Sequence, residues 1–264
     1  THQGKGLFKP VFKFKDDALF EWPYEVSADI VLKYDLEIEG DRGNARFIYD
    51  LDFNEMCKSK IDTYQFLPEF SPQTYFCQSE DQLIVAIKNI ETEKFVIKPN
   101  RGVCGRDVYI LEKDNVKIPK NLNPILYNEG VLVQEFIDTS GGCLGIVEST
   151  HDLRLSMIND RNIMTSVSTP AVRSLVANWH RGAVVTEVDV EKLPLSVRSF
   201  RDQIHEKIRR KYGSVMYNID LGVTPQGPKL IELNSPIAFS RPDWKSTDLY
   251  LLNLVEYVDS LSLP

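Results

Sequence analysis

The chain has 264 residues, of which 42% are hydrophobic and 26% are charged, as in ordinary globular proteins. Its net charge of −7 argues weakly against a nucleic-acid-binding surface. No apolar run reaches the roughly 18 residues of a membrane-spanning helix. We therefore expect a globular protein of one or two domains that binds neither nucleic acid nor membrane.

The cysteines and the first residues bear on the compartment. The four cysteines, at positions 57, 77, 104 and 143, form no CxxC pair and have no histidine at zinc-ligand spacing. The first 15 residues lack the long apolar core of a signal peptide. This pattern favours free thiols in a reducing compartment, so we expect a cytoplasmic protein.

The first half of the chain mixes strands and helices. Residues 1–55 favour strands, with a hairpin or sheet edge predicted over 28–53. A helix is predicted for residues 54–67, with Asn54 as N-cap, and a second for 79–90, with Ser79 as N-cap. A buried strand "KFVIKP", a loop "NRGVCG" and a strand "DVYIL" follow.

The second half continues this mixture. "VLVQEF" and "THDLRLSMIND" predict strands, the latter with a turn at Asn159-Asp160, and residues 199–212 predict an amphipathic helix that ends at Gly213. Residues 215–221 and 229–233 flank a Pro/Gly turn as a hairpin, before a final helix. Because there is no regular βαβ alternation, we expect an α+β fold of two facing lobes.

Lys98 is the first candidate functional residue. It lies inside the apolar strand "FVIKP", where a buried ammonium needs an anion or an exit to water. Gly102 and Gly105 follow in a loop whose backbone can approach a ligand closely, as in phosphate-binding loops. The alternative interpretation is an edge-strand lysine that reaches solvent.

A hairpin near the C-terminus carries the second set of candidates. Glu232 and Asn234 are two residues apart and share one face of their strand, and Asp220 lies late on the partner strand. Their side-chain oxygens are hard ligands suited to Mg²⁺. The alternative is a set of polar residues that only flank a turn.

Other polar residues indicate a binding site only when they are considered together. Lys58 and Lys60 alone are typical solvated helix lysines, and Gln134, Glu135 and Asp138 form an acidic strand end. Such an end could also offer backbone groups to an adenine edge and a carboxylate to ribose. Cationic side chains among apolar neighbours suit anionic ligands; those in question are Arg154, Arg173, His180 and Arg181.

In order along the chain, these segments resemble the ATP-grasp family. The resemblance rests on the helix lysine, "FVIKP" with its glycine loop, "VQEFID", "DLR", "NWHRGA" and "NID…IELNSP". The last three are most similar to the branch of ribosomal-protein glutamate ligases, with glutathione synthetases more distant. The resemblance implies an ATP-grasp fold: a reduced strand-rich segment over 1–55, a first lobe over 56–130 and a second lobe with the metal site over 131–264.

The resemblance also implies roles for individual residues. Lys60 and Lys98 would contact the ATP phosphates, with Lys58 as the alternative to Lys60, and the loop with Gly102 and Gly105 would close over them. Asp220, Glu232 and Asn234 would ligate two Mg²⁺ ions, for which Mn²⁺ could substitute. The remaining roles are adenine for Gln134, Glu135 and Ile137, ribose for Asp138, and the transferred phosphate for Arg154, Asn178 and Arg181.

The implied reaction joins a carboxylate and an amine into an amide or peptide bond through an acyl phosphate, with ADP as a product. The partners would be small-molecule or peptide substrates. Two alternatives stay open: an ATP-grasp kinase that phosphorylates a small-molecule hydroxyl, and a non-catalytic nucleotide-binding module. The sequence leaves open whether the protein forms a homo-oligomer.

Overall fold

The structure is a computed structural model. It describes residues 7–8, 11–15, 18–22, 26–27, 30–31, 46–48, 50–102, 105–171, 174, 182–235, 237 and 241–262. Of the predicted site residues, Asn178 and Arg181 lie outside this description, as do Arg173 and His180. Among the described residues, no helix is both long and apolar enough to cross a membrane.

The N-terminal part forms short strands. They are β1 (Leu7–Phe8), β2 (Val11–Lys15), β3 (Ala18–Trp22), β4 (Val26–Ser27), β5 (Ile30–Val31) and β6 (Arg46–Phe47). β1 pairs with β4 and β2 with β3, both antiparallel. Over 28–53 a hairpin or sheet edge was predicted; the hairpin is wrong in the described part, because β5 and β6 pair in parallel.

A broken helix connects this part to the first lobe. α1 (Leu51–Lys58) and α2 (Lys60–Phe66) are separated by Ser59, where a single helix over 54–67 was predicted. Asp50, rather than Asn54, is the N-cap of α1, and it accepts a hydrogen bond from the backbone N–H of Phe53.

The first lobe is a four-stranded antiparallel sheet with two helices. Its strand order is β7-β10-β8-β9. The strands are β7 (Thr74–Cys77), β8 (Lys94–Pro99), β9 (Tyr109–Glu112) and β10 (Val131–Glu135), and the helices are α3 (Glu80–Asn89) and α4 (Leu122–Asn128). Phe95 and Ile97 of the sheet pack with Leu83 of α3 and Leu126 of α4 in a core of their own.

The second lobe is a five-stranded antiparallel sheet in the order β13-β12-β11-β14-β15. Its strands are β11 (Asp152–Ile158), β12 (Arg161–Thr169), β13 (Val184–Val188), β14 (Tyr217–Thr224) and β15 (Gly227–Asn234). α5 (Leu195–Tyr212) packs against this sheet through Val197, Ile204 and Ile208, and Gly213 caps it as predicted. α6 (Thr247–Ser262) contacts β11 and β12.

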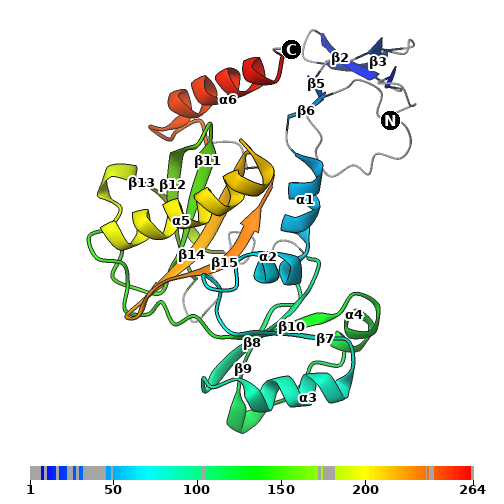
Figure 1. The fold of residues 1–264 in the computed structure, drawn as a ribbon, viewed down its shortest axis with the longest axis vertical. Coiled ribbons are helices and arrows are strands. Elements are labelled where there is room, and N and C mark those ends of the chain that lie inside the picture. Colours follow the sequence, from blue (N-terminus) through cyan, green and yellow to red (C-terminus); the bar gives the residue numbers. More distant parts are fainter. Residues whose placement is uncertain are drawn as a thin grey trace.

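The two lobes meet near α2 and the loop after β8 (Figure 1). Residues of α1, including Phe53 and Met56, belong to the core of the five-stranded sheet. β10 lies between β7 and β8, so the change of sheet falls after Glu135 rather than at the predicted boundary of 131. The arrangement confirms the predicted α+β class.

Candidate active site

The β14–β15 hairpin brings its three polar side chains together. Asp220 faces Glu232 across the two strands, and Asn218 faces Asn234. The Nδ2 of Asn234 lies 2.9 Å from Oδ2 of Asp220 and 3.3 Å from Oε1 of Glu232. A bulge follows immediately, because the pairing shifts between Asp220 and Leu221 and leaves Ile231 as the extra residue.

Arg154 on the neighbouring strand completes this cluster. It lies opposite Asp220 in the register of β11 and β14. Its Nε and Nη2 donate to the two carboxylate oxygens of Asp220 at 2.7 and 2.6 Å, a bidentate pair. The charge of Asp220 raises the pKa of Arg154, so the guanidinium stays charged at any ordinary pH.

Lys98 reaches the hairpin from the first lobe. It is 6% exposed, and its Nζ donates to the backbone oxygen of Ile231 at 3.4 Å. Burial lowers the pKa of Lys98 to about 8, with a further contribution from the nearby charge of Lys60. The lysine therefore remains mostly charged at neutral pH.

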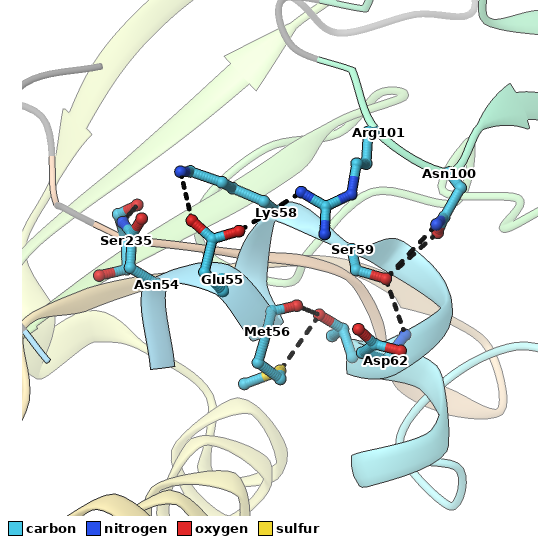
Figure 2. Close-up of polar contacts among 10 residues, drawn as sticks. Asn54, Glu55, Met56, Lys58, Ser59, Asp62, Asn100, Arg101 and Ser235 are labelled. Atoms are coloured by element: carbon cyan, nitrogen blue, oxygen red, sulfur yellow. Dashed lines mark hydrogen bonds and ion pairs between the residues drawn. The ribbon is translucent and has the colours of Figure 1, made fainter. Parts of the chain in front are cut away.

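The two candidate lysines of the broken helix point to different partners. The Nζ of Lys60 donates to the backbone oxygen of Gly102 at 2.8 Å. The Nζ of Lys58 instead pairs with Glu55 at 2.7 Å, on an exposed surface (Figure 2). Lys60, not Lys58, is thus the lysine that the structure places at the glycine loop and near Lys98.

The carboxyl groups of the cluster respond differently to burial. Burial opposes ionisation of Glu232, but the charges of Lys60, Lys98 and Arg154 outweigh it and lower the pKa. Burial raises the pKa of Asp220, with Arg154 acting against it and Glu232 adding to it. The cluster therefore combines three cations with two carboxyl groups, and their charges interact where the two lobes meet.

Asp152 is a member of the cluster that sequence analysis did not single out. Burial, together with the negative charges of Asp220 and Glu232, raises its pKa to about 7. Asp152 and Arg154 are two residues apart on β11, so they share one face of the strand. That spacing in "DLR" was the available signal.

The end of β10 and the residues after it form the crossing between the lobes. Gln134 points into the first lobe, where its Nε2 donates to Oγ1 of Thr74 at 2.7 Å. Glu135 accepts from the backbone N–H of Gln73 at 3.4 Å. The backbone N–H of Ser140 donates to Asp138 at 2.9 Å, and hydrogen bonding to Ser140 lowers the pKa of Asp138.

The hairpin cluster fits a hard cation by its donor set. Asp220, Glu232 and Asn234 offer carboxylate and amide oxygens, and such oxygens suit Mg²⁺. The described residues contain no group of three or more His, Cys, Asp and Glu arranged to hold a metal. Mg²⁺ usually takes one or two carboxylates from a protein and its other ligands from substrate phosphates and water, and the donor set of Asp220, Glu232 and Asn234 fits that pattern.

Comparison with known proteins assigns the family. The family model of the RimK-like ATP-grasp domain matches residues 60–247. The chain belongs to this family. No curated protein matches the chain.

Solved structures share the fold at low identity. D-alanyl-alanine synthetase A from Vibrio cholerae is 13% identical with a TM-score of 0.63, over 96% of this chain and 81% of that one. D-cycloserine synthetase DcsG is 14% identical with a TM-score of 0.58, over 82% and 74%. The ATP-grasp ligase PsnB, solved with a minimal precursor, Mg and ADP, is 12% identical with a TM-score of 0.55, over 83% and 64%.

These similarities establish an ATP-grasp fold. The chain spans 63% to 66% of the length of the first solved structures that it matches, which is less than two thirds. The similar structures named here are ligases or synthetases by their descriptions.

Proposed function

We propose that this protein is an ATP-dependent carboxylate–amine ligase that forms an amide or peptide bond and releases ADP and phosphate. The observation that carries the proposal is the contact of Lys98 with β15, the strand of Glu232 and Asn234, together with the contact of Lys60 with the glycine loop that follows Lys98. Cations for a phosphate chain and oxygen ligands for a metal are what phosphoryl transfer from ATP requires.

In this proposal, Lys60 and Lys98 bind phosphate oxygens, and the loop with Gly102 and Gly105 covers them. Gln134, Glu135 and Ile137 frame adenine, and Asp138 holds ribose. Asp220, Glu232 and Asn234 hold two Mg²⁺ ions, which supply charge neutralisation at the phosphates when bound; Mn²⁺ would substitute. PsnB, a structural relative, was solved with Mg and ADP.

The proposed chemistry needs no nucleophile from the protein. A substrate carboxylate oxygen attacks the γ-phosphorus, the bond to the β-phosphate oxygen breaks, and ADP leaves. The amine then attacks the acyl carbon, phosphate leaves, and the amine loses a proton to the medium. Arg154, with Asn178 and Arg181 from the "NWHRGA" motif, stabilises the negative charge on the transferred phosphoryl group and on the oxyanion.

Turnover with a mixture of acceptors tests the proposal. The protein is incubated with ATP, Mg²⁺ and pooled amino acids and peptides, and ADP, phosphate and product masses are followed. An amide product with ADP and phosphate supports the ligase. A stable phosphorylated product would replace it with a kinase, and no turnover with any acceptor would leave a nucleotide-binding module.

A matched pair of variants tests the metal cluster. Glu232→Gln removes a carboxylate from the cluster and should abolish turnover. Glu206→Gln makes the same chemical change on the exposed face of α5, where Glu206 pairs with Arg210 at 2.8 Å, and should leave turnover unchanged. A fully active Glu232→Gln enzyme would remove the metal assignment.

A further inference from the structure

The break between α1 and α2 occurs at a single residue. Ser59 has φ −98° and ψ 108°, outside the helical region, and it serves as C-cap of α1 and N-cap of α2. Its Oγ accepts from the backbone N–H of Asp62 at 3.4 Å. A helix start leaves its first N–H groups without partners inside the helix, and Ser59 satisfies one of them.

The other N–H groups at the start of α2 that have no partner inside the helix are satisfied by Asn100 of the first lobe. The N–H of Lys60 donates to the backbone oxygen of Asn100 at 3.1 Å, and the N–H of Ile61 donates to its Oδ1 at 2.9 Å. The Nδ2 of Asn100 also lies 3.4 Å from Oγ of Ser59. Asn100 therefore caps α2 although it lies 39 positions after Ile61 in the chain. Figure 2 shows its side chain next to Ser59.

Asn100 is itself fixed to the first lobe. Its backbone N–H donates to the oxygen of Gly130 at 3.1 Å, and the residue, directly after β8, is 8% exposed. It lies two residues after Lys98 and two before Gly102, whose oxygen accepts from Lys60. One residue thus connects the strand of Lys98, the glycine loop and the first turn that carries Lys60.

Lys60 and Lys98 carry like charges close to each other. Their ammonium groups repel each other, and this repulsion contributes to the lowered pKa of Lys98. Asn54 anchors the other half of the broken helix by donating its Nδ2 to the backbone oxygen of Ser235, directly after Asn234 (Figure 2). The helix pair is therefore fastened to the glycine loop on one side and to the hairpin cluster on the other.

We propose that Asn100 of the first lobe is a positioning residue, which caps α2 and so holds Lys60 and Lys98 side by side for a polyphosphate chain. The polyphosphate part of this inference rests on the proposed function. Asn100 acts through the two lysines and through the loop.

Variants at Asn100 test this inference against a matched cap. Asn100→Ala removes the acceptor of the Ile61 N–H, whereas Asn100→Asp keeps it. Ser79→Ala is the matched control in the same lobe. Ser79 is the N-cap of α3, and its Oγ accepts from the backbone N–H of Gln82 at 3.3 Å. The measurements are Mg²⁺–ADP affinity by calorimetry, amide hydrogen exchange at Ile61, and titration of the lysine side chains by NMR without nucleotide.

Asn100→Ala should weaken Mg²⁺–ADP binding by about tenfold or more, because a lysine that moves away from the phosphates contributes much less to binding them. It should also speed exchange at Ile61 and raise the pKa of Lys98 as Lys60 moves away. Asn100→Asp should keep Ile61 protected and restore the affinity. Ser79→Ala should change stability but neither the affinity nor the Lys98 titration.

The two hypotheses fail separately. If the unaltered protein binds no Mg²⁺–ADP, the proposed function fails, and the titration of Lys98 still decides whether Asn100 positions the lysines. An unchanged Lys98 titration in Asn100→Ala would overturn the inference. If Asn100→Ala does not fold, Asn100→Gln provides the same comparison, because it keeps the amide but displaces its oxygen by one methylene.

Discussion

Arg154 and Asp220 form a charge pair whose members differ in exposure: the side chain of Arg154 is 41% exposed and that of Asp220 is 10%. Removing Arg154 would leave the more buried carboxylate without its bidentate partner. We expect Arg154→Met to lower the free energy of unfolding by about 1–3 kcal/mol, less than for a fully buried pair because solvent screens the guanidinium. Chemical unfolding at neutral pH measures this.

The double variant Arg154→Met/Asp220→Asn tests whether the unpaired charge of Asp220 causes the loss of stability. It should recover part of the lost stability, because the unpaired charge is gone. Arg210→Met is the control: Arg210 is 76% exposed and pairs with Glu206, so its loss should change stability by no more than about 0.5 kcal/mol. No recovery in the double variant would contradict the role assigned to the charge.

Lys98 should give nucleotide binding a specific pH dependence. Its pKa of about 8 means that it loses its positive charge as the pH rises through that value. Affinity for Mg²⁺–ADP should therefore be highest below pH 8 and fall above it, by up to about tenfold per pH unit. Calorimetry at pH values from about 6.5 to about 9.5, on both sides of this pKa, measures the fall in affinity.

Lys98→Arg provides the comparison for this profile. Arginine keeps its charge at every pH of the experiment, so the decline above pH 8 should be absent, whatever the variant's absolute affinity. The same decline in both proteins would assign it to another group. In that case Lys98 would not be the cation that meets the phosphates.

Sequence reasoning was most successful at this site where the contacts are local. Asp220, Glu232 and Asn234 lie on one hairpin, so strand periodicity alone predicts that they meet, and they do. The pairing of Arg154 with Asp220 depends on the register of β11 against β14, which involves residues 66 positions apart. No local pattern encodes such a register.

At the scale of elements, the sequence predicts helix ends correctly where the capping residue is a neighbour in the chain. Ser79 caps α3 and Gly213 ends α5, both as predicted. The break at Ser59 was not predicted, because the periodicity over 54–67 is helical. The residue that stabilises the start of the second helix, Asn100, lies 39 positions after Ile61 in the chain. A cap supplied from a distant segment leaves no signal in the neighbouring residues.

Gly222 determines how the crossing between the lobes packs on β14. A Cβ at this position would lie 2.6 Å from Cγ2 of Thr139 and 2.9 Å from Cγ2 of Ile137. Neither atom belongs to a long flexible side chain, so we expect Gly222→Ala to lower the free energy of unfolding by about 1–3 kcal/mol through overpacking. Chemical unfolding measures this as well.

Two further variants make this prediction specific. Gly141→Ala is the control, since a Cβ there meets nothing within 4 Å and the change should be nearly neutral. Thr139→Ser removes the nearer methyl group and keeps the hydroxyl that accepts from the N–H of His151 at 3.0 Å. In the Gly222→Ala background it should restore part of the stability; equal losses at Gly141 and Gly222 would refute the packing argument.

At the scale of the whole molecule, the order of elements was enough to predict two α+β lobes. The strand order β7-β10-β8-β9 was not predictable, because β10 inserts between two strands that precede it by tens of residues. Because β10 is the last strand of this sheet, the first lobe is one continuous segment of the chain, from Thr74 to Glu135. Its hydrophobic core is distinct from that of the five-stranded sheet.

A continuous segment with its own core should open as a unit. By size, a segment of this length has a stability of about 3–9 kcal/mol, less than that of the whole chain. Native-state hydrogen exchange at increasing denaturant should therefore show Phe95, Ile97 and Val133 opening together, at a lower free energy than Leu155 and Ile219 of the second lobe.

Bound ligand should remove much of this difference. Mg²⁺–ADP contacts both lobes in the proposed function, so saturation at about 100 times Kd should raise the opening free energy of the first lobe by about 2.7 kcal/mol. Glu232→Gln, which removes a proposed metal ligand from the second lobe only, should lose most of that increase although Phe95 and Val133 lie in the other core. If amides of both lobes exchange at one common free energy without ligand, the lobes unfold as a single unit and the two cores are not separate in stability.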